Sequence, residues 1–532
     1  MRFARIRAYI FPVAVAALLM GWCLNERGVY IYDEAHFLLA ARTMEDGVRG
    51  LLAGQPMSAL KSDILRTGGT LYFAAKPGHI ALLALIGLAT GGLTAFKGVL
   101  LSVTAGIGIV LLTQSITVKR CGDITGLIAG VFAALTPLMI ASSRSALGLS
   151  TSVFFTLLAG RLLMMSARRD VLVGVSSGIA AFMAFSCHYN SIVLMAAITA
   201  GLWPSIAKRR RYIMAGGFIA CVMLSEAFTQ LAAYFIRPVY TGYRTFLGEL
   251  IYNFMSYQAA PFSPARSSVT EEFFPDGAHG YGIDAWLYLL SSWWHGFGIL
   301  LPLAIVGTIS MVKGRGVSHS GGRLFLWWGW MPFVFWSLYP WKVERSFMGV
   351  APGLAAIAAT AASSWLTGNH RIFTNQSEQT LMFPARLRPG IMRTLSWIMI
   401  MSLYFNILII QQSLKNDRSP FALVVSRAPE YIRALPANSI TGWSAGWRSL
   451  PQWKWYLGPE FRQRYGAYPP AIDFSLRQSP GVLCIDMLTS SSQARQHIGD
   501  GFSMLPHKTM IQAATHRGWA ELAIADMSFP PE

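Results

Sequence analysis

The sequence predicts a mainly α-helical membrane protein, a polytopic bundle of about eleven spans with additional interfacial helices and a small C-terminal extramembrane α/β domain. Three observations lead to this prediction. The 532 residues are 53% hydrophobic and only 13% charged, which is too apolar for one soluble core. Apolar stretches recur at about the 20-residue length that a membrane helix needs. The Lys and Arg residues stand in short clusters between these stretches.

The net charge of +19 does not predict a nucleic-acid partner. The basic residues occur in clusters such as MRFARIR, VKR and AKRRR beside apolar runs, and this pattern is a topology signal rather than a polyanion groove. The five cysteines include no CxxC motif. Neither a disulfide framework nor a zinc site is therefore predicted.

Eleven apolar stretches are long enough to be candidate spans. They are 8–24, 97–117, 124–141, 148–165, 171–187, 189–206, 212–235, 286–311, 323–340, 347–366 and 395–412. The first follows a basic leader, but no A-x-A-like cleavage site follows it, so we expect it to remain as an uncleaved span. The stretch 78–93 is short and ends in glycines, which favours an interfacial or re-entrant helix; if it does cross, the number of spans rises.

The positive-inside rule predicts which loops face the cytoplasm. These are Arg2 to Arg7, Lys119/Arg120, Arg168/Arg169, Lys208 to Arg211, Lys313/Arg315 and the 367–394 loop. The N-terminus is then cytoplasmic, and the C-terminal domain lies on the outer, periplasmic side of a bacterial inner membrane.

Three long segments follow on the outer face. Residues 25–77 contain FLLAARTMEDGVRGLL, which has the spacing of an amphipathic helix lying on the membrane. Residues 236–285 are rich in Tyr, Pro, Ser and Gly, as in a long lid loop. In the tail 413–532, GVLCIDM and ANSITGW predict strands and AELAIADM predicts a helix. We therefore expect a membrane domain over 1–412 and a periplasmic α/β domain over 413–532.

Asp33 and Glu34 form a carboxylate pair just after the first span. Carboxylates beside apolar surface are costly to desolvate, so they persist there when they are partnered or functional. The alternative is a pair of ordinary loop acids in water. We expect a catalytic pair.

Four cations accompany this pair on the predicted outer face: Lys76, Arg144, Lys342 and Arg345. For any one of these cations alone, the simpler interpretation is a residue at the end of a span that extends its charged group to the membrane interface. Together they predict a site for a phosphate or pyrophosphate next to a general base.

Three further ionisable residues are candidate substrate contacts. His79 and His188 lie on the predicted outer side, where capped or solvated histidines are the commoner alternative. Glu226 lies inside an apolar run, and we expect it to have a structural role or to line the donor cavity.

The start of the tail is crowded with aromatic residues, Trp443, Trp447, Trp453, Trp455 and Tyr456. Aromatic rings stack on sugars, but they also anchor proteins at the membrane interface, and the second interpretation is favoured.

No cofactor is expected. Hard divalent cations need several oxygen ligands, and the second outer loop offers only the hydroxyls of Ser142, Ser143 and Ser145. We predict a metal-independent site, although the sequence leaves a divalent ion open.

Several motifs resemble those of the C-type (GT-C) integral membrane glycosyltransferases. They are YIYDEAHFLLAAR after the first span, KPGH at the start of the short apolar segment, PLMIASSRSAL, and the late RSFMGVAPGLA. The resemblance is strongest to the branch of the lipid A aminoarabinose transferase and the protein O-mannosyltransferases. It covers residues 8–412 as architecture.

The resemblance implies roles for individual residues. Asp33 matches the acceptor-activating base, and Glu34 stands beside it. Lys76 matches the lysine of the Lys-Pro-Pro turn, Arg144 the arginine of the second outer loop, and Arg345, less securely Lys342, the late basic position. The last four would hold the phosphate of a polyprenyl-phosphate sugar donor.

Two positions depart from the resembled pattern. Ala75 and Gly78 replace an acidic residue and a second proline around Lys-Pro, and no aspartate follows Arg144 closely. These departures put the sugar and the acceptor in doubt.

The predicted function is therefore an inverting glycosyltransferase with a glycolipid, glycan or protein acceptor. A phosphate-linked sugar already carries a good leaving group, so a base and several cations suffice. Two alternatives remain: a lipid-linked glycan transporter or flippase, and an O-antigen polymerase or ligase. The ionisable residues gather at one face rather than along a path, and no internal repeat is evident, which disfavours transport.

Overall fold

The computed structural model describes a large part of the chain. The described residues are 2–24, 29, 32–56, 76–165, 170–188, 190–236, 277–279, 282–313, 320–339, 341–367, 404–411, 427, 440–444, 455–456, 482–486, 507–515 and 518–526. Most of the predicted lid loop 236–285 and the cytoplasmic loop 367–394 lie outside them.

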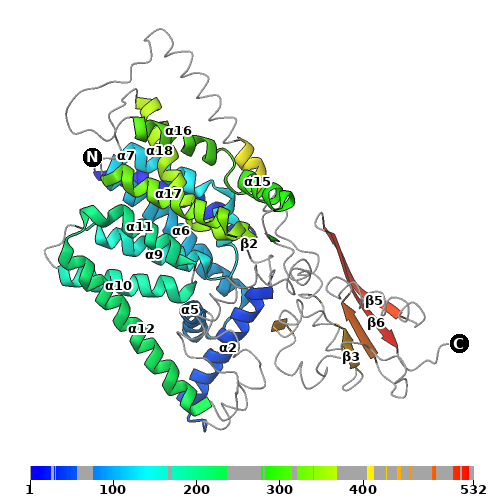
Figure 1. Cartoon of the computed structure of the whole chain (residues 1–532). Helices are drawn as coiled ribbons and strands as arrows, with labels where there is room; N and C mark the ends of the chain where they lie inside the picture. The colour runs from blue at the N-terminus through cyan, green and yellow to red at the C-terminus, as the bar shows by residue number, and fades with distance from the viewer. Residues whose placement is uncertain are drawn as a thin grey trace. The chain divides into compact units, whose positions relative to one another are not determined.

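The chain divides into two compact units, whose elements are labelled in Figure 1. The first comprises Met1–Trp22, Ala74–His79 and Val99–Leu414. The second comprises Cys23–Phe73, Ile80–Gly98 and Lys415–Glu532. The predicted domain boundary at residues 412 and 413 stays a prediction.

Helices occupy every apolar stretch predicted between residues 8 and 366. In chain order they are α1 Arg2–Gly21, α6 Ala95–Cys121, α7 Asp123–Ala134, α8 Pro137–Ser143, α9 Leu149–Leu163, α10 Asp170–Cys187, α11 Ser191–Leu202, η2 Trp203–Ser205, α12 Lys208–Ile236, α15 Ile283–Phe297, α16 Leu300–Lys313, α17 Ser320–Leu338, η6 Glu344–Gly349 and α18 Ala351–Thr367. A short antiparallel pair, β1 Gly277–His279 and β2 Trp341–Val343, joins two loops of the first unit.

The structure breaks two of the stretches predicted as single spans. The 124–141 stretch becomes α7 and α8, bent by 60° where Pro137 opens the second helix. Proline lacks the N–H that would continue the first helix. The 286–311 stretch becomes α15 and α16, bent by 87° at Gly298, whose φ of +53° favours glycine.

The core of the first unit is built around α18. This helix packs against α7, α16 and α17, and its residues from Ala351 to Ala362 are almost all buried. Small residues allow this close packing, because a Cβ on Gly353 would lie only 2.7 Å from the backbone nitrogen of Gly329. Similar helix pairs are α9 with α10 and α10 with α12.

Among the described residues, α6 and α10 are each long and apolar enough to cross a membrane. The bent pairs α7–α8 and α15–α16 raise the number to four if each pair forms one span. The prediction of eleven spans is not tested by this finding, which covers the described part of the chain.

The second unit contains helix α2 Tyr32–Leu52, most of α5 Pro77–Ala89 and a four-stranded sheet. Helix α2 confirms the helix predicted within 25–77. Helix α5 has 13 residues, about 20 Å of helix, which is shorter than a hydrocarbon core of about 30 Å. This length fits the predicted interfacial or re-entrant helix, which stays a prediction.

The sheet has the order β3-β4-β6-β5, with β3 and β4 parallel and the other pairs antiparallel. Its strands are β3 Ile440–Ser444, β4 Val482–Asp486, β5 His507–Thr515 and β6 Gly518–Asp526. The strands predicted in ANSITGW and GVLCIDM are confirmed. The helix predicted in AELAIADM was wrong, because β6 pairs with a neighbour on each edge and these ladders outweigh the helix propensity of Ala, Glu and Leu.

Candidate functional site

Arg144 is the C-cap residue of α8, and its side chain is buried. One guanidinium nitrogen, Nη1, donates to the carbonyl oxygens of Met20 at 3.0 Å and Trp22 at 2.7 Å. These carbonyls stand at the C-terminal end of α1, where helix carbonyls lack intrahelical partners and positive charge is favourable. The guanidinium is thus fixed against the end of the first helix, and its predicted contact with a phosphate stays a prediction.

His79, in the first turn of α5, supports the loop that follows Arg144. Its Nε2 lies 3.1 Å from the carbonyl oxygen of Ala146, and its Nδ1 lies 3.3 Å from the hydroxyl of Thr151. A carbonyl only accepts, so Nε2 carries the proton. Because both ring nitrogens make contacts, His79 holds the second outer loop against the start of α5.

Gly148 leaves room for this contact between His79 and the loop. Its φ of +79° lies in the left-handed region, and a Cβ there would come within 2.7 Å of the Cys187 carbonyl oxygen and 3.0 Å of the His79 ring. No other residue type fits without a shift of the loop.

His188 follows α10 directly and is 7% exposed. Its Nδ1 accepts a hydrogen bond from the backbone N–H of Asn190 at 3.2 Å. Burial lowers the pKa of His188 well below its usual 6.5, and the nearby charges of Lys76 and Arg345 and the ring of His79 lower it further. Three of the predicted site residues, Lys76, His79 and Arg345, therefore lie within electrostatic reach of a fourth, His188.

Lys76 immediately precedes α5 and is 8% exposed. Pro77 opens the helix, which suits proline's fixed φ and missing N–H. The following position admits only glycine, because a Cβ on Gly78 would overlap the Ser186 side chain and lie 3.0 Å from the Ser186 carbonyl carbon. This packing explains why no second proline follows Lys-Pro here.

Lys342, on β2, is completely buried. Its ammonium donates to the carbonyl oxygen of Tyr339 at 2.7 Å and to that of Ser337, and lies 4.9 Å from the centre of the Trp286 ring. Burial lowers the pKa of Lys342. These contacts let it cap the C-terminal end of α17, whereas the half-buried Arg345 lies a short distance further along, on η6.

Asp33 and Glu34 occupy the first turn of α2, where the helix dipole stabilises negative charge. Glu34 is 1% exposed, whereas Asp33 is half-buried. They belong to the second unit and the cations to the first, so the predicted approach of the pair to the cations stays a prediction.

Two remaining predictions concern Glu226 and a metal. Glu226 is half-buried on α12, and its role stays a prediction. Within the described ranges, no three His, Cys, Asp or Glu side chains gather as a metal site would require. This finding leaves metal dependence as a question for experiment.

Sequence reasoning missed Thr151 and Gly148, the two residues that orient His79. The sequence SRSALGLST contains both, but a glycine just before a helix and a threonine in its first turn carry no signal until this segment is folded against α5 and α10.

Comparisons with known proteins identify the fold of the chain. No model of a known protein family matches the sequence, and neither does any curated protein. The structure resembles that of ArnT from Cupriavidus metallidurans bound to undecaprenyl phosphate, with a TM-score of 0.53 and 13% identity over 98% of this chain and 99% of that one. For the same protein in the apo state the TM-score is 0.51, with 12% identity and 98% of each chain covered.

The archaeal oligosaccharyltransferase from Archaeoglobus fulgidus, in its apo form, gives a TM-score of 0.50 at 11% identity. The match covers 85% of this chain but 64% of the archaeal one, so this chain spans less than two thirds of that protein. The chain has the GT-C glycosyltransferase fold, as the sequence motifs predicted. With its apolar helices, this architecture is that of a multi-pass membrane protein.

Proposed function

We propose that the protein is an inverting glycosyltransferase that moves a sugar from a polyprenyl-phosphate carrier to a hydroxyl on a cell-envelope glycolipid, glycan or protein. The observation that carries the proposal is the match over 98% of this chain to ArnT in a structure bound to undecaprenyl phosphate. The active site would open to the periplasm, and the donor would approach from the bilayer.

The cations of the first unit support a phosphate site. Lys76 is nearly buried and lies within electrostatic reach of His188, as does Arg345. Cations held in a partly water-excluded place stabilise a departing phosphate far better than cations in water. Lys76 and Arg345 are therefore the proposed phosphate-binding residues, beside a neutral His188. Arg144 and Lys342 would contribute their charges from fixed positions.

The proposed reaction is a single displacement. The acceptor hydroxyl oxygen attacks the anomeric carbon, and the bond from that carbon to the phosphate oxygen breaks. The polyprenyl phosphate leaves with the bonding electron pair, and a carboxylate takes the acceptor proton. One displacement inverts the anomeric centre, since retention would need a second carboxylate acting as nucleophile.

Asp33 is the proposed base. Adjacent helix residues point about 100° apart, so the two carboxylates of the first turn of α2 leave the helix in different directions. Asp33 is the more exposed of the two, which suits a group that must meet a substrate. The buried Glu34 would support the start of the helix.

A transfer assay separates this function from its alternatives. The purified protein is reconstituted with a radiolabelled polyprenyl-phosphate sugar and an envelope extract as the acceptor source. A transferase moves the label from the lipid to a larger product and releases polyprenyl phosphate. Movement of intact labelled lipid between the two leaflets, with no release, would instead identify a transporter.

A further inference from the structure

Helix α2 carries Asp33 and Glu34, so whatever fixes α2 also sets the position of the proposed base. Two sets of contacts fix it within the second unit. One comes from the end of α5, and the other comes from Trp455 and Tyr456, in the C-terminal third of the chain.

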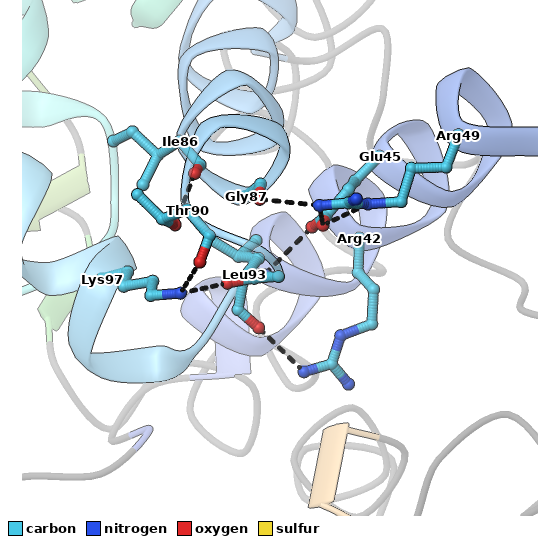
Figure 2. Close-up of polar contacts among 9 residues, drawn as sticks. Arg42, Glu45, Arg49, Ile86, Gly87, Thr90, Leu93 and Lys97 are labelled. Carbon is cyan, nitrogen blue, oxygen red and sulfur yellow. Dashed lines mark hydrogen bonds and ion pairs between the residues drawn. The ribbon is translucent and has the colours of Figure 1, made fainter. Parts of the chain in front are cut away.

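The α5 contacts hold the middle and end of α2 (Figure 2). The buried carboxylate of Glu45 accepts from the backbone N–H of Leu93 at 3.0 Å and from Arg49 Nε at 3.0 Å. Arg49 also donates to the carbonyl oxygen of Gly87 at 3.0 Å. These bonds lie three or more turns along the helix from Asp33.

Arg42 links α2 to both α5 and Trp455. Its Nη2 donates to the Leu93 carbonyl oxygen at 3.2 Å (Figure 2), and its Nη1 lies 3.4 Å from the Trp455 carbonyl oxygen. The guanidinium carbon stands 3.7 Å from the centre of the Trp455 ring. Such stacking is strongest where water is excluded, and Trp455 is only 5% exposed.

The next residue contacts the chain just before α2. The backbone N–H of Val29 donates to the Tyr456 hydroxyl at 3.0 Å, and Val29 is buried. Two consecutive residues thus contact α2 and its lead-in on both sides of Asp33 in the sequence.

We propose that Trp455 and Tyr456 are positioning residues that hold the N-terminal half of α2 and the residues just before it, and thereby the proposed base Asp33. This inference rests on the proposed function. It makes the C-terminal segment a part of the catalytic apparatus, rather than a separate domain joined to a membrane enzyme. It also differs from the two roles that the sequence offered for Trp455, because one face of the ring is occupied by Arg42 and almost none of the residue is exposed.

The test compares Trp455→Ala and Trp455→Phe with Trp203→Ala. Trp203 is a matched control, since Arg211 stacks on its ring at 4.2 Å in the first unit. Two readouts are taken on the full-length protein: hydrogen exchange of the α2 backbone amides, which needs no substrate, and kcat and KM for the polyprenyl-phosphate sugar.

We expect Trp455→Ala to raise exchange in the N-terminal half of α2, up to Arg42, and to lower kcat by about 10- to 100-fold, with KM for the donor changed by less than about threefold. Trp455→Phe retains a ring and should recover most of kcat, and Trp203→Ala should match the wild type. If Trp455→Ala is poorly folded, Tyr456→Phe, with the exposed Tyr212→Phe as control, removes only the hydroxyl that Val29 contacts.

Unchanged exchange in α2, or loosened exchange with unchanged kcat, overturns the inference. Failure of the proposed function looks different: the wild-type protein would then transfer no sugar from the labelled lipid, while the exchange result for Trp455→Ala would be unaffected.

Discussion

The guanidinium carbon of Arg42 lies 3.7 Å from the centre of the Trp455 ring, although 413 positions separate the two residues in the sequence. Arg42 closes the motif YIYDEAHFLLAAR, which carries the resemblance to GT-C enzymes, whereas Trp455 lies in the tail that the sequence assigns to a separate domain. This stack is the reason to treat the tail and the candidate catalytic helix as one functional part.

Gly148→Ala should destabilise the protein. The left-handed backbone costs about 1–2 kcal/mol for a residue with a Cβ, and contact with the Cys187 carbonyl oxygen adds to this. Thermal unfolding in detergent measures the effect. Gly216→Ala is the control, since a Cβ there meets nothing within 4 Å, and alanine in a helix should stabilise by up to about 1 kcal/mol. Equal melting temperatures for the two variants would contradict the described loop.

Arg144→Ala should lower the free energy of unfolding by about 2–4 kcal/mol, because the carbonyls of Met20 and Trp22 lose a charged donor. Arg323→Ala, at an exposed position on α17, serves as the control. Chemical or thermal unfolding checks both variants. A stable Arg144→Ala protein that is merely inactive would mean that the arginine acts on substrate alone.

The phosphate assignment is tested by binding rather than turnover. Lys76→Gln and Arg345→Gln should each weaken binding of undecaprenyl phosphate by about 10- to 100-fold, the loss expected for a hydrogen bond to a charged group. Calorimetric titration in detergent gives the dissociation constants. Arg323→Gln removes a charge of the same kind from an exposed site and should bind as the wild type does. Unaltered affinity in both site variants would exclude these two residues from the phosphate site.

Stability should fall as the pH drops below about 6.5, the pKa of a histidine in the unfolded chain. His188 has a lowered pKa in the folded protein, so the unfolded chain binds the proton first and acid favours unfolding. Above pH 6.5, His188 is neutral in both the folded and the unfolded protein. It therefore contributes nothing to the pH dependence of the free energy of unfolding there. Below it, the free energy of unfolding should decline by up to about 1.4 kcal/mol per pH unit until the folded protein also protonates.

Unfolding curves between pH 4.5 and 8, roughly the span in which histidines titrate, provide the measurement. His188→Gln should show a smaller slope below pH 6.5 than the wild type. Identical slopes would mean that His188 is solvated, and would remove it from the buried cluster with Lys76 and Arg345.

The sequence predicts the helices well because apolar length and periodicity are local properties. It placed α6 and α10 within about four residues at each end. It missed the breaks at Pro137 and Gly298, where a single proline or glycine within an apolar run is ambiguous until the neighbouring helices are known. It also misassigned 520–526, since pairing on both edges of β6 is a non-local effect that residue propensities do not contain.

The candidate site was predictable in part. Charge and motif order suggested Lys76, His79 and Arg345 together with His188, and the first three lie within electrostatic reach of His188 in the first unit. The same patterns said nothing of the carbonyls that Arg144 and Lys342 bind, because capping contacts depend on where distant helices end. The pairing of Arg42 with Trp455 was likewise beyond reach, since it depends on the fold of the tail against α2.

The central claim is that Asp33 takes the proton of the acceptor hydroxyl, while Lys76 and Arg345 bind the phosphate of the carrier lipid. Its most direct test is single-turnover transfer from a radiolabelled polyprenyl-phosphate sugar by Asp33→Asn, with Asp46→Asn as the control, since Asp46 is an exposed acid on the same helix. The account predicts a rate about 10²- to 10⁴-fold lower for Asp33→Asn, with undecaprenyl phosphate affinity and melting temperature unchanged, and a wild-type rate for Asp46→Asn. Transfer by Asp33→Asn at the rate of Asp46→Asn would contradict it.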